Sequence, residues 1–182
     1  MRVISGIAGG RKIVTLPGLD VRPTSEKVKE AIFSSIQFEL EGRRFLDLFA
    51  GCGQMGIEAI SRGAQSATLV DNSASHLKVV KENLTATGLE NKAKVVCADY
   101  SAFLNACNDV FDIAFLDPPY YDGLILTALE KTCKVMSSFG KILCEHPKEI
   151  GLPETVNDFY CYKKYNYGKI VISAYRRKDL SE

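Results

Sequence analysis

The order of apolar and amphipathic segments is the feature that most limits how this chain can fold. From residue 45 onward, short apolar segments alternate with segments whose apolar residues recur at helical spacing. Apolar segments separated by helices are typical of a parallel sheet with helices on both faces. The expected strands are 45–49, 66–70, 93–97, 112–116 and 141–145, and the expected helices are 55–62, 73–88, 100–107 and 124–136. The sequence therefore predicts an α/β fold.

The N-terminal segment follows a different pattern. Residues 2–5 and 12–16 are rich in β-branched residues and flank a glycine-containing turn, which predicts a small hairpin. A helix is expected over 26–37, after an N-cap at Thr24 or Ser25.

The C-terminal segment also departs from the alternating pattern. Residues 159–165 and 169–176 are β-rich and predict an antiparallel hairpin at the end of the sheet. A plain dinucleotide dehydrogenase does not need such a hairpin. We divide the chain into an extension made of a hairpin and a helix, 1–40, and a main domain, 41–182.

Composition excludes several classes of protein. The 182 residues are 46% hydrophobic, which fits a globular domain with a real core. No apolar run approaches the ~20 residues of a membrane span, and the first residues lack the apolar segment of a signal peptide. The six cysteines form no Cys-x-x-Cys pair and the two histidines are far apart. We therefore expect free thiols in the cytoplasm, no metal site and no membrane association.

The net charge of +1 is unevenly distributed. Lys and Arg against Asp and Glu number six and two in 1–29, eleven and eighteen in 30–160, and six and two in 161–182, giving +4, −7 and +4. The basic ends could bind a polyanion, or they could be solvated termini. Charge alone leaves both interpretations open.

A glycine-rich segment, Asp47 to Gly56, follows the first expected strand and leads into a helix. Such a turn lets backbone N–H groups approach a ligand at a helix N-terminus. Gly51, Gly53 and Gly56 fit Gly-x-Gly-x-x-Gly, and Asp71 at the end of the next strand could bind ribose hydroxyls. These residues predict a nucleoside cofactor and leave its identity open.

A second motif, Asp117-Pro118-Pro119-Tyr120, directly follows the fourth expected strand. Two prolines fix the backbone, so the Asp117 carboxylate and the Pro118 carbonyl make two acceptors for the hydrogens of one amino group. Tyr120 offers a ring on which a flat base could stack. The two acceptors would localise the lone pair of an exocyclic amine and direct it at an electrophile, which suits direct methyl transfer.

Both motifs fall at the same edge of the expected sheet. The segments 47–56 and 117–120, together with Asp71 and Asp99, all lie where an expected strand ends. Ligands of parallel sheets bind at the carboxyl ends of the strands. We therefore expect these residues to form one site.

At these residues the chain resembles the class I methyltransferases and their amino-group members. The segments Met1 to Gly6, Arg22 to Ser25 and Phe115 to Asp117 narrow the resemblance. From residue 1 to about 176, the chain is similar to the RsmD family of bacterial 16S rRNA (guanine-N2)-methyltransferases. The resemblance implies a Rossmann-like, mostly parallel sheet of seven strands that ends in the C-terminal hairpin. It also implies methyl transfer from S-adenosylmethionine to the N2 of a guanine.

The resemblance implies roles for individual residues. The residues that it places along the cofactor are Thr24, Asp47, Phe49, Gly51, Gly53, Asp71, Asp99 and Tyr100. Asp71 would bind the ribose, Asp99 the adenine amino group, and Thr24 would close over the cofactor. The residues that would hold the guanine are Asp117, Pro118 and Tyr120, and those that would contact rRNA are Arg11, Lys12 and Arg22. The expected partner is 16S rRNA in the small ribosomal subunit, and we expect a monomer.

Other functions share part of this pattern. An adenine-N6 or cytosine-N4 methyltransferase also uses Asp-Pro-Pro-Tyr, but little of the chain is left for a target-recognition domain. An NAD-dependent dehydrogenase shares the glycine motif and Asp71, but it does not explain residues 117–120. A non-catalytic RNA-binding module is the third alternative.

Overall fold

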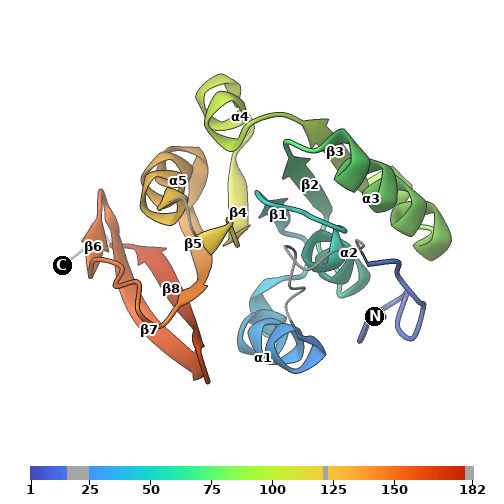
Figure 1. Cartoon of the computed structure of the whole chain (residues 1–182), viewed down its shortest axis with the longest axis horizontal. Helices are drawn as coiled ribbons and strands as arrows, with labels where there is room; N and C mark the ends of the chain where they lie inside the picture. Colours follow the sequence, from blue (N-terminus) through green and yellow to red (C-terminus); the bar gives the residue numbers. More distant parts are fainter. Residues whose placement is uncertain (16–24, 121–122, 179–182) are drawn as a thin grey trace.

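The computed structural model describes residues 1–15, 25–120 and 123–178. Its sheet has eight strands in the order β3-β2-β1-β4-β5-β8-β7-β6 (Figure 1). The strands are β1 Arg44–Asp47, β2 Ser66–Asp71, β3 Ala93–Cys97, β4 Phe111–Leu116, β5 Met136–Pro147, β6 Thr155–Val156, β7 Phe159–Tyr167 and β8 Ile170–Arg177. The first five pair in parallel, and the last three are antiparallel. The predicted α/β sheet with a closing hairpin is confirmed, with one short strand, β6, beyond the expected seven.

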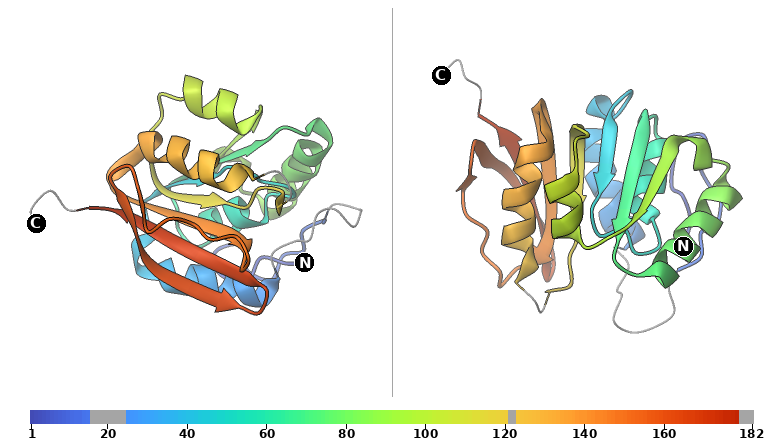
Figure 2. Two further views of the ribbon diagram at one scale, coloured as in Figure 1. Left: turned by 60° about the vertical axis from the view of Figure 1, so that its left-hand side comes forward. Right: turned by 90° about the horizontal axis from the view of Figure 1, so that it is seen from above.

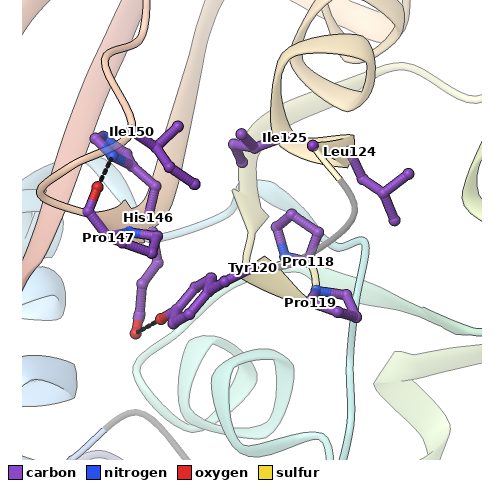
Figure 3. A pocket seen from close by; sticks show the side chains of 10 residues that line it. Pro118, Pro119, Tyr120, Leu124, Ile125, His146, Pro147 and Ile150 are labelled. Atoms are coloured by element: carbon purple, nitrogen blue, oxygen red, sulfur yellow. Dashed lines mark hydrogen bonds between the residues drawn. The ribbon is translucent and has the colours of Figure 1, made fainter.

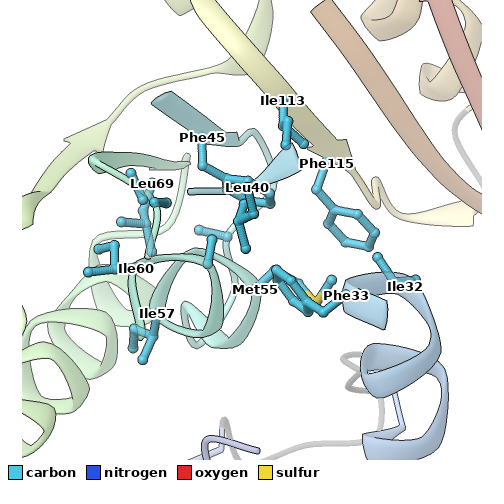
Figure 4. Close-up of a cluster of buried hydrophobic side chains, with 14 of the residues drawn as sticks. Ile32, Phe33, Leu40, Phe45, Met55, Ile57, Ile60, Leu69, Ile113 and Phe115 are labelled. Carbon is cyan, nitrogen blue, oxygen red and sulfur yellow. The ribbon is translucent and has the colours of Figure 1, made fainter. Parts of the chain in front are cut away.

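Helices cover both faces of this sheet (Figures 1 and 2). They are α1 Glu26–Ile36, α2 Gln54–Ser61, α3 Ala74–Thr87, α4 Tyr100–Ala106 and α5 Leu124–Thr132, with 3-10 turns η1 Gln37–Glu39, η2 Glu90–Lys92 and η4 Cys133–Val135. Apolar side chains of α1, α2 and α3 form one core cluster with one face of the sheet (Figure 4). Those of α4 and α5 form a second cluster on the other face. The result is a three-layer α/β/α arrangement.

The ends of α3 agree with the predicted helix 73–88 to within one residue. Its N-cap Ser73 accepts a hydrogen bond from the His76 backbone N–H, and Gly88 ends the helix with φ of 69°. A side-chain oxygen at the N-cap and a left-handed glycine after the last turn are the usual boundaries of a helix.

The predicted helix 124–136 is confirmed over 124–132 and is wrong in its last four residues. The α-helix ends at Thr132, and Met136 already pairs with Phe111 as the first residue of β5. Gly140, expected to end the helix, lies inside β5, where an added Cβ would come 2.8 Å from the Met136 Cβ. Pairing with β4 therefore overrides the local helical pattern.

The N-terminal hairpin is held onto α2. Within residues 1–15, its two arms form one antiparallel bridge, between Arg2 and Lys12. Gly6 has φ of 86°, and an added Cβ would lie 1.8 Å from the carbonyl oxygen of Ser61 in α2. Only glycine permits this backbone approach. Val3 from the hairpin joins the same core cluster as the sheet. The division of the chain at residue 40 stays a prediction.

Candidate active site

Asp47, the last residue of β1, anchors the glycine-rich segment from inside the protein. Its side chain is 2% exposed, and Oδ2 accepts a hydrogen bond of 2.9 Å from the Gly56 N–H. An added Cβ at Gly56 would lie 2.7 Å from the Leu69 side chain, so a larger residue there would force the buried Leu69 to shift. Burial raises the pKa of Asp47 to about 7, and the nearby Asp71 carboxylate contributes to the rise. Asp47 is thus a buried acid whose charge is poorly stabilised by the folded protein alone.

This burial predicts a pH-dependent effect of Asp47→Asn. An unfolded Asp has a pKa near 3.9, so the folded protein binds the proton more tightly, and stability is lost as pH rises toward 7. The Asn variant keeps an acceptor for Gly56 and loses this penalty. We expect it to exceed the wild type in unfolding free energy by roughly 2–4 kcal/mol at pH 8. Urea unfolding at pH 4 and pH 8 measures the difference, which should nearly vanish at pH 4. A difference independent of pH would contradict the assignment.

Asp71 joins the glycine turn to α3. Its Oδ2 accepts a hydrogen bond of 2.9 Å from the Gly51 N–H, and its Oδ1 accepts one of 2.9 Å from the Ser73 N–H. The His76 ring lies 3.1 Å from Oδ1 through Nδ1. Gly51 has φ of 54° and Gly53 has φ of 81°, so the turn bends in a way that side chains disfavour. Asp71 lies at the end of β2, as predicted from the sequence, and its carboxylate holds the glycine turn that follows β1.

Removal of this carboxylate should weaken cofactor binding. If Asp71 binds the cofactor ribose, as the resemblance implies, Asp71→Ala removes the ribose acceptor as well as the hydrogen-bond partner of the Gly51 N–H. Hydrogen bonds to charged groups contribute ~1.5–3 kcal/mol, so affinity should fall about 10- to 100-fold. Calorimetric titration with S-adenosylmethionine measures this, and Asp71→Asn, which keeps an acceptor for Gly51, should lose less. Unchanged affinity in the Ala variant would refute the ribose role.

The segments that follow β1 and β3 contact each other at the same edge of the sheet. The rings of Phe49 and Tyr100 lie 5.4 Å apart between centroids, inclined by 40°. Asp99 caps α4, because its Oδ1 accepts hydrogen bonds from the Ser101 and Ala102 N–H groups. Only one oxygen of Asp99 is used in these bonds, so Oδ2 is available to an amino group of a ligand.

Asp117 to Tyr120 follow β4 and meet the end of β5 (Figure 3). The Tyr120 hydroxyl donates a hydrogen bond of 3.2 Å to Oε1 of Glu145, which is 4% exposed. Burial raises the pKa of Asp117 well above its usual range, and the Glu145 and Asp47 carboxylates raise it further. The prolines, Tyr120 and Glu145 line a cavity of about 10 Å³, which is room for about one water molecule.

Three buried polar residues near the site, Glu145, His146 and Asn83, were not predicted from the sequence. Glu145 and His146 at the end of β5 are each 4% exposed, and His146 Nε2 lies 2.8 Å from the Ser173 hydroxyl. Two polar residues that follow an apolar strand were the available signal. Asn83 in α3 donates from Nδ2 to the carbonyl oxygens of Val14 and Cys52, each at 2.9 Å. It thereby ties the N-terminal segment to the glycine turn, which no local pattern indicates.

The residues expected to contact RNA lie apart from this edge or outside the described residues. Arg11 and Lys12 are exposed on the N-terminal hairpin, and Arg11 Nη1 donates a hydrogen bond of 2.6 Å to the Thr87 carbonyl at the end of α3. Arg22 lies outside the described residues, and so does Thr24, which was expected to close over the cofactor. The roles of all four stay predictions.

The donor and acceptor groups at this edge fit a nucleoside bearing a ribose and an exocyclic amine. Asp71 and Asp99 stand at the ends of neighbouring strands, with Gly51 beside Asp71 and the Phe49 and Tyr100 rings next to them. In the described residues, no three His, Cys, Asp or Glu side chains gather where they could hold a metal ion. None of the described helices is long and apolar enough to cross a membrane.

The fold and this site define a class I methyltransferase that uses S-adenosylmethionine. The sequence profile described as "Conserved hypothetical protein 95", that of the RsmD family, matches residues 1–176. The chain belongs to this family.

Individual relatives span nearly the whole chain. A Bacillus subtilis (strain 168) protein, YlbH, provisionally named an rRNA methyltransferase, is 39% identical over 98% of this chain and 100% of its own length. Ribosomal RNA small subunit methyltransferase D of Escherichia coli (strain K12) is 30% identical over 100% of this chain and 92% of its own. A solved structure from Escherichia coli, yhhF, provisionally titled a methyltransferase, has a TM-score of 0.87 at 31% identity and covers 98% of both chains.

Proposed function

We propose that this protein transfers a methyl group from S-adenosylmethionine to the exocyclic N2 of a guanine in 16S rRNA. The observation that carries the proposal is the position of Asp117, Pro118 and Tyr120, at the same sheet edge as the Gly51–Asp71 contact. A hydride-transfer enzyme has no use for an acceptor pair there. Relatives named for methylation of small-subunit rRNA support the choice of substrate.

The cofactor supplies an electrophilic methyl group on sulfonium sulfur when it is bound. Its ribose would lie at Asp71, its adenine amino group at Asp99, and its methionine end along Asp47, Phe49, Gly51 and Gly53, with Thr24 closing over it. The Asp117 carboxylate and the Pro118 carbonyl accept the two hydrogens of N2 and aim its lone pair. Tyr120 stacks on the guanine, with its hydroxyl fixed by Glu145.

Because its pKa is raised, Asp117 can also accept the proton that N2 loses during methyl transfer. When N2 forms its bond to the methyl carbon, the carbon–sulfur bond breaks and N2 must lose a proton. A carboxylate with a high proton affinity, already in contact with that hydrogen, is the nearest acceptor. The methylated guanine and S-adenosylhomocysteine then leave, and Asp117 returns the proton to water.

A guanine inside a helix cannot reach this edge, so the target must be unpaired or flipped out. The cavity of about 10 Å³ also has to widen to admit a base. The net charge of only +1 suits docking on an assembled subunit better than tight binding to free RNA. We infer that the protein acts as a monomer in the cytoplasm, on the small ribosomal subunit.

One experiment tests substrate and chemistry together. Unmodified small subunits and naked 16S rRNA are incubated with the protein and methyl-labelled S-adenosylmethionine, and the labelled nucleoside is identified by mass spectrometry. We expect N2-methylguanosine at one position, formed faster on subunits. Label in adenine N6 or cytosine N4 would replace the proposal with another amino methyltransferase, and equal rates on naked RNA would refute the subunit preference.

A further inference from the structure

The outer hairpin, β7 and β8, carries a row of tyrosines and cations on one face. Residues directly opposite one another in neighbouring strands share a face of the sheet. Tyr160 lies opposite Arg176, Lys163 opposite Ala174, and Tyr165 opposite Ile172. Ile172 and Ala174 belong to the core cluster on the α1 side, and Tyr162 and Tyr165 pack against it. We call Tyr160, Tyr162, Lys163, Tyr165 and Arg176 the tyrosine–cation surface.

The rings hold the cations of this surface in place. The Arg176 guanidinium lies 5.1 Å from the ring centroid of Tyr160 and 5.4 Å from that of Tyr162. The Lys163 ammonium lies 4.8 Å from the ring centroid of Tyr165. Cation–π contacts of this length orient a cation without neutralising it. Lys163 and Arg176 are both exposed, and each of the three rings is partly exposed.

On the opposite face of the same hairpin, the cations form ion pairs with carboxylates. Lys164, next in sequence to Lys163, pairs with Glu154 at 2.6 Å, and Arg177 pairs with Asp158 at 3.0 Å. Among the described residues, neither Lys163 nor Arg176 pairs with a carboxylate. Lys164 and Arg177 on one face are therefore paired with carboxylates, whereas Lys163 and Arg176 on the other face have no such pair among the described residues.

The tyrosine–cation surface begins beside the active site. Tyr165 lies opposite Ile172, which lies opposite Glu145, the residue that accepts the Tyr120 hydroxyl hydrogen bond. Two strand spacings separate the backbones of Tyr165 and Glu145, or about 10 Å. A strand of RNA whose flipped base is held at Tyr120 would have its neighbouring nucleotides within reach of this face.

We propose that the tyrosine–cation surface binds the rRNA strand that flanks the target guanine. Lys163 and Arg176 contact its phosphates, and the exposed parts of the tyrosine rings contact unpaired bases. Cations without carboxylate partners, interleaved with aromatic rings on a sheet, favour single-stranded RNA over a protein partner. The proposal rests on the proposed function, because that function supplies the RNA.

The neighbouring residues Lys163 and Lys164 provide a matched test. Lys163→Ala and Lys164→Ala change the net charge by the same amount on opposite faces, so a difference between the two variants reports the position of the charge and not its amount. We compare them with Lys163→Arg and with Lys163→Ala combined with Arg176→Ala. The readouts are kcat and KM on unmodified subunits, and the salt dependence of binding to a single-stranded 16S rRNA oligonucleotide. S-adenosylmethionine binding, followed by calorimetry, reports on folding.

Each phosphate contact contributes ~0.7 to the slope of log affinity against log salt for single strands. We expect the double variant to lose about 1.4 from this slope and its KM to rise about tenfold, with little change in kcat. Lys164→Ala and Lys163→Arg should resemble the wild type. Equal slopes and KM values for Lys163→Ala and Lys164→Ala would overturn the inference. If the wild type methylates no ribosomal substrate, the proposed function fails, while the oligonucleotide slope still tests the surface.

Discussion

Asp117→Ala should abolish methyl transfer while cofactor binding persists. The variant loses one of the two acceptors that orient N2 and also the nearest acceptor for the proton. Positioned proton transfer contributes ~10²–10⁴-fold and orientation adds to it, so we expect a loss of at least about 10³-fold in kcat. Single-turnover methylation of small subunits measures the rate, and calorimetry measures cofactor affinity. A near-normal rate would refute the role of Asp117.

Asp112 offers a matched control on the same strand. Asp112 lies near the start of β4 and pairs with Arg44 at 3.4 Å, far along the strand from the site. Asp112→Ala should leave kcat unchanged, which separates a catalytic loss from the general effect of removing a carboxylate from β4.

The pH profile gives a second test of Asp117. Activity requires its carboxylate, and its pKa is raised, so the rate should climb with pH until that pKa is passed. Glu145→Gln removes a neighbouring negative charge and keeps an acceptor for Tyr120. We expect the acid limb of the profile to move to lower pH in this variant. A limb that stays in place would contradict coupling between Asp117 and Glu145.

Glu58→Ala should destabilise the protein more than any other single change discussed above. Glu58 is fully buried in α2 and lies 3.3 Å from the fully buried Lys29 ammonium of α1. Its carboxylate also accepts hydrogen bonds from the Ile4 and Ser5 N–H groups and from Arg62 Nε, at 2.8, 3.1 and 2.7 Å. Burial lowers the pKa of Lys29, and Glu58 opposes that shift. Removal of one partner from a buried pair typically costs ~3–5 kcal/mol.

Denaturant unfolding measures this loss against a surface ion pair. Glu154→Ala breaks a pair with Lys164 whose side chains are 74% and 42% exposed, so its effect should stay below ~1 kcal/mol. If Glu58→Ala does not fold, Glu58→Gln combined with Lys29→Met removes both charges and keeps one of the two side-chain oxygens that accept from the Ile4 and Ser5 N–H groups. We expect that double variant to be more stable than Glu58→Ala. Equal effects of Glu58→Ala and Glu154→Ala would contradict the argument.

Local signals in the sequence predicted most of the helices and strands and the sheet edge at which polar residues lie. Apolar periodicity, the Ser73 cap and the Gly88 terminus act within one or two turns, so they can be read without knowledge of the partners. The glycine turn, Asp71 and Asp117 to Tyr120 were found for the same reason, because each directly follows an apolar segment.

Contacts between residues far apart in the sequence could not be predicted and are seen only in the folded chain. Glu145 lies 25 residues from Tyr120, Lys29 lies 29 residues from Glu58, and Asn83 lies 31 residues from Cys52. The end of α5 also depends on distant residues, because pairing of Met136 with β4 ends the helical segment earlier than predicted. The different partners of Lys163 and Lys164, which lie on opposite faces of the hairpin, were likewise not predictable from the sequence. Burial, pKa shifts and ion pairing depend on neighbours brought together by folding, and no local pattern encodes those neighbours.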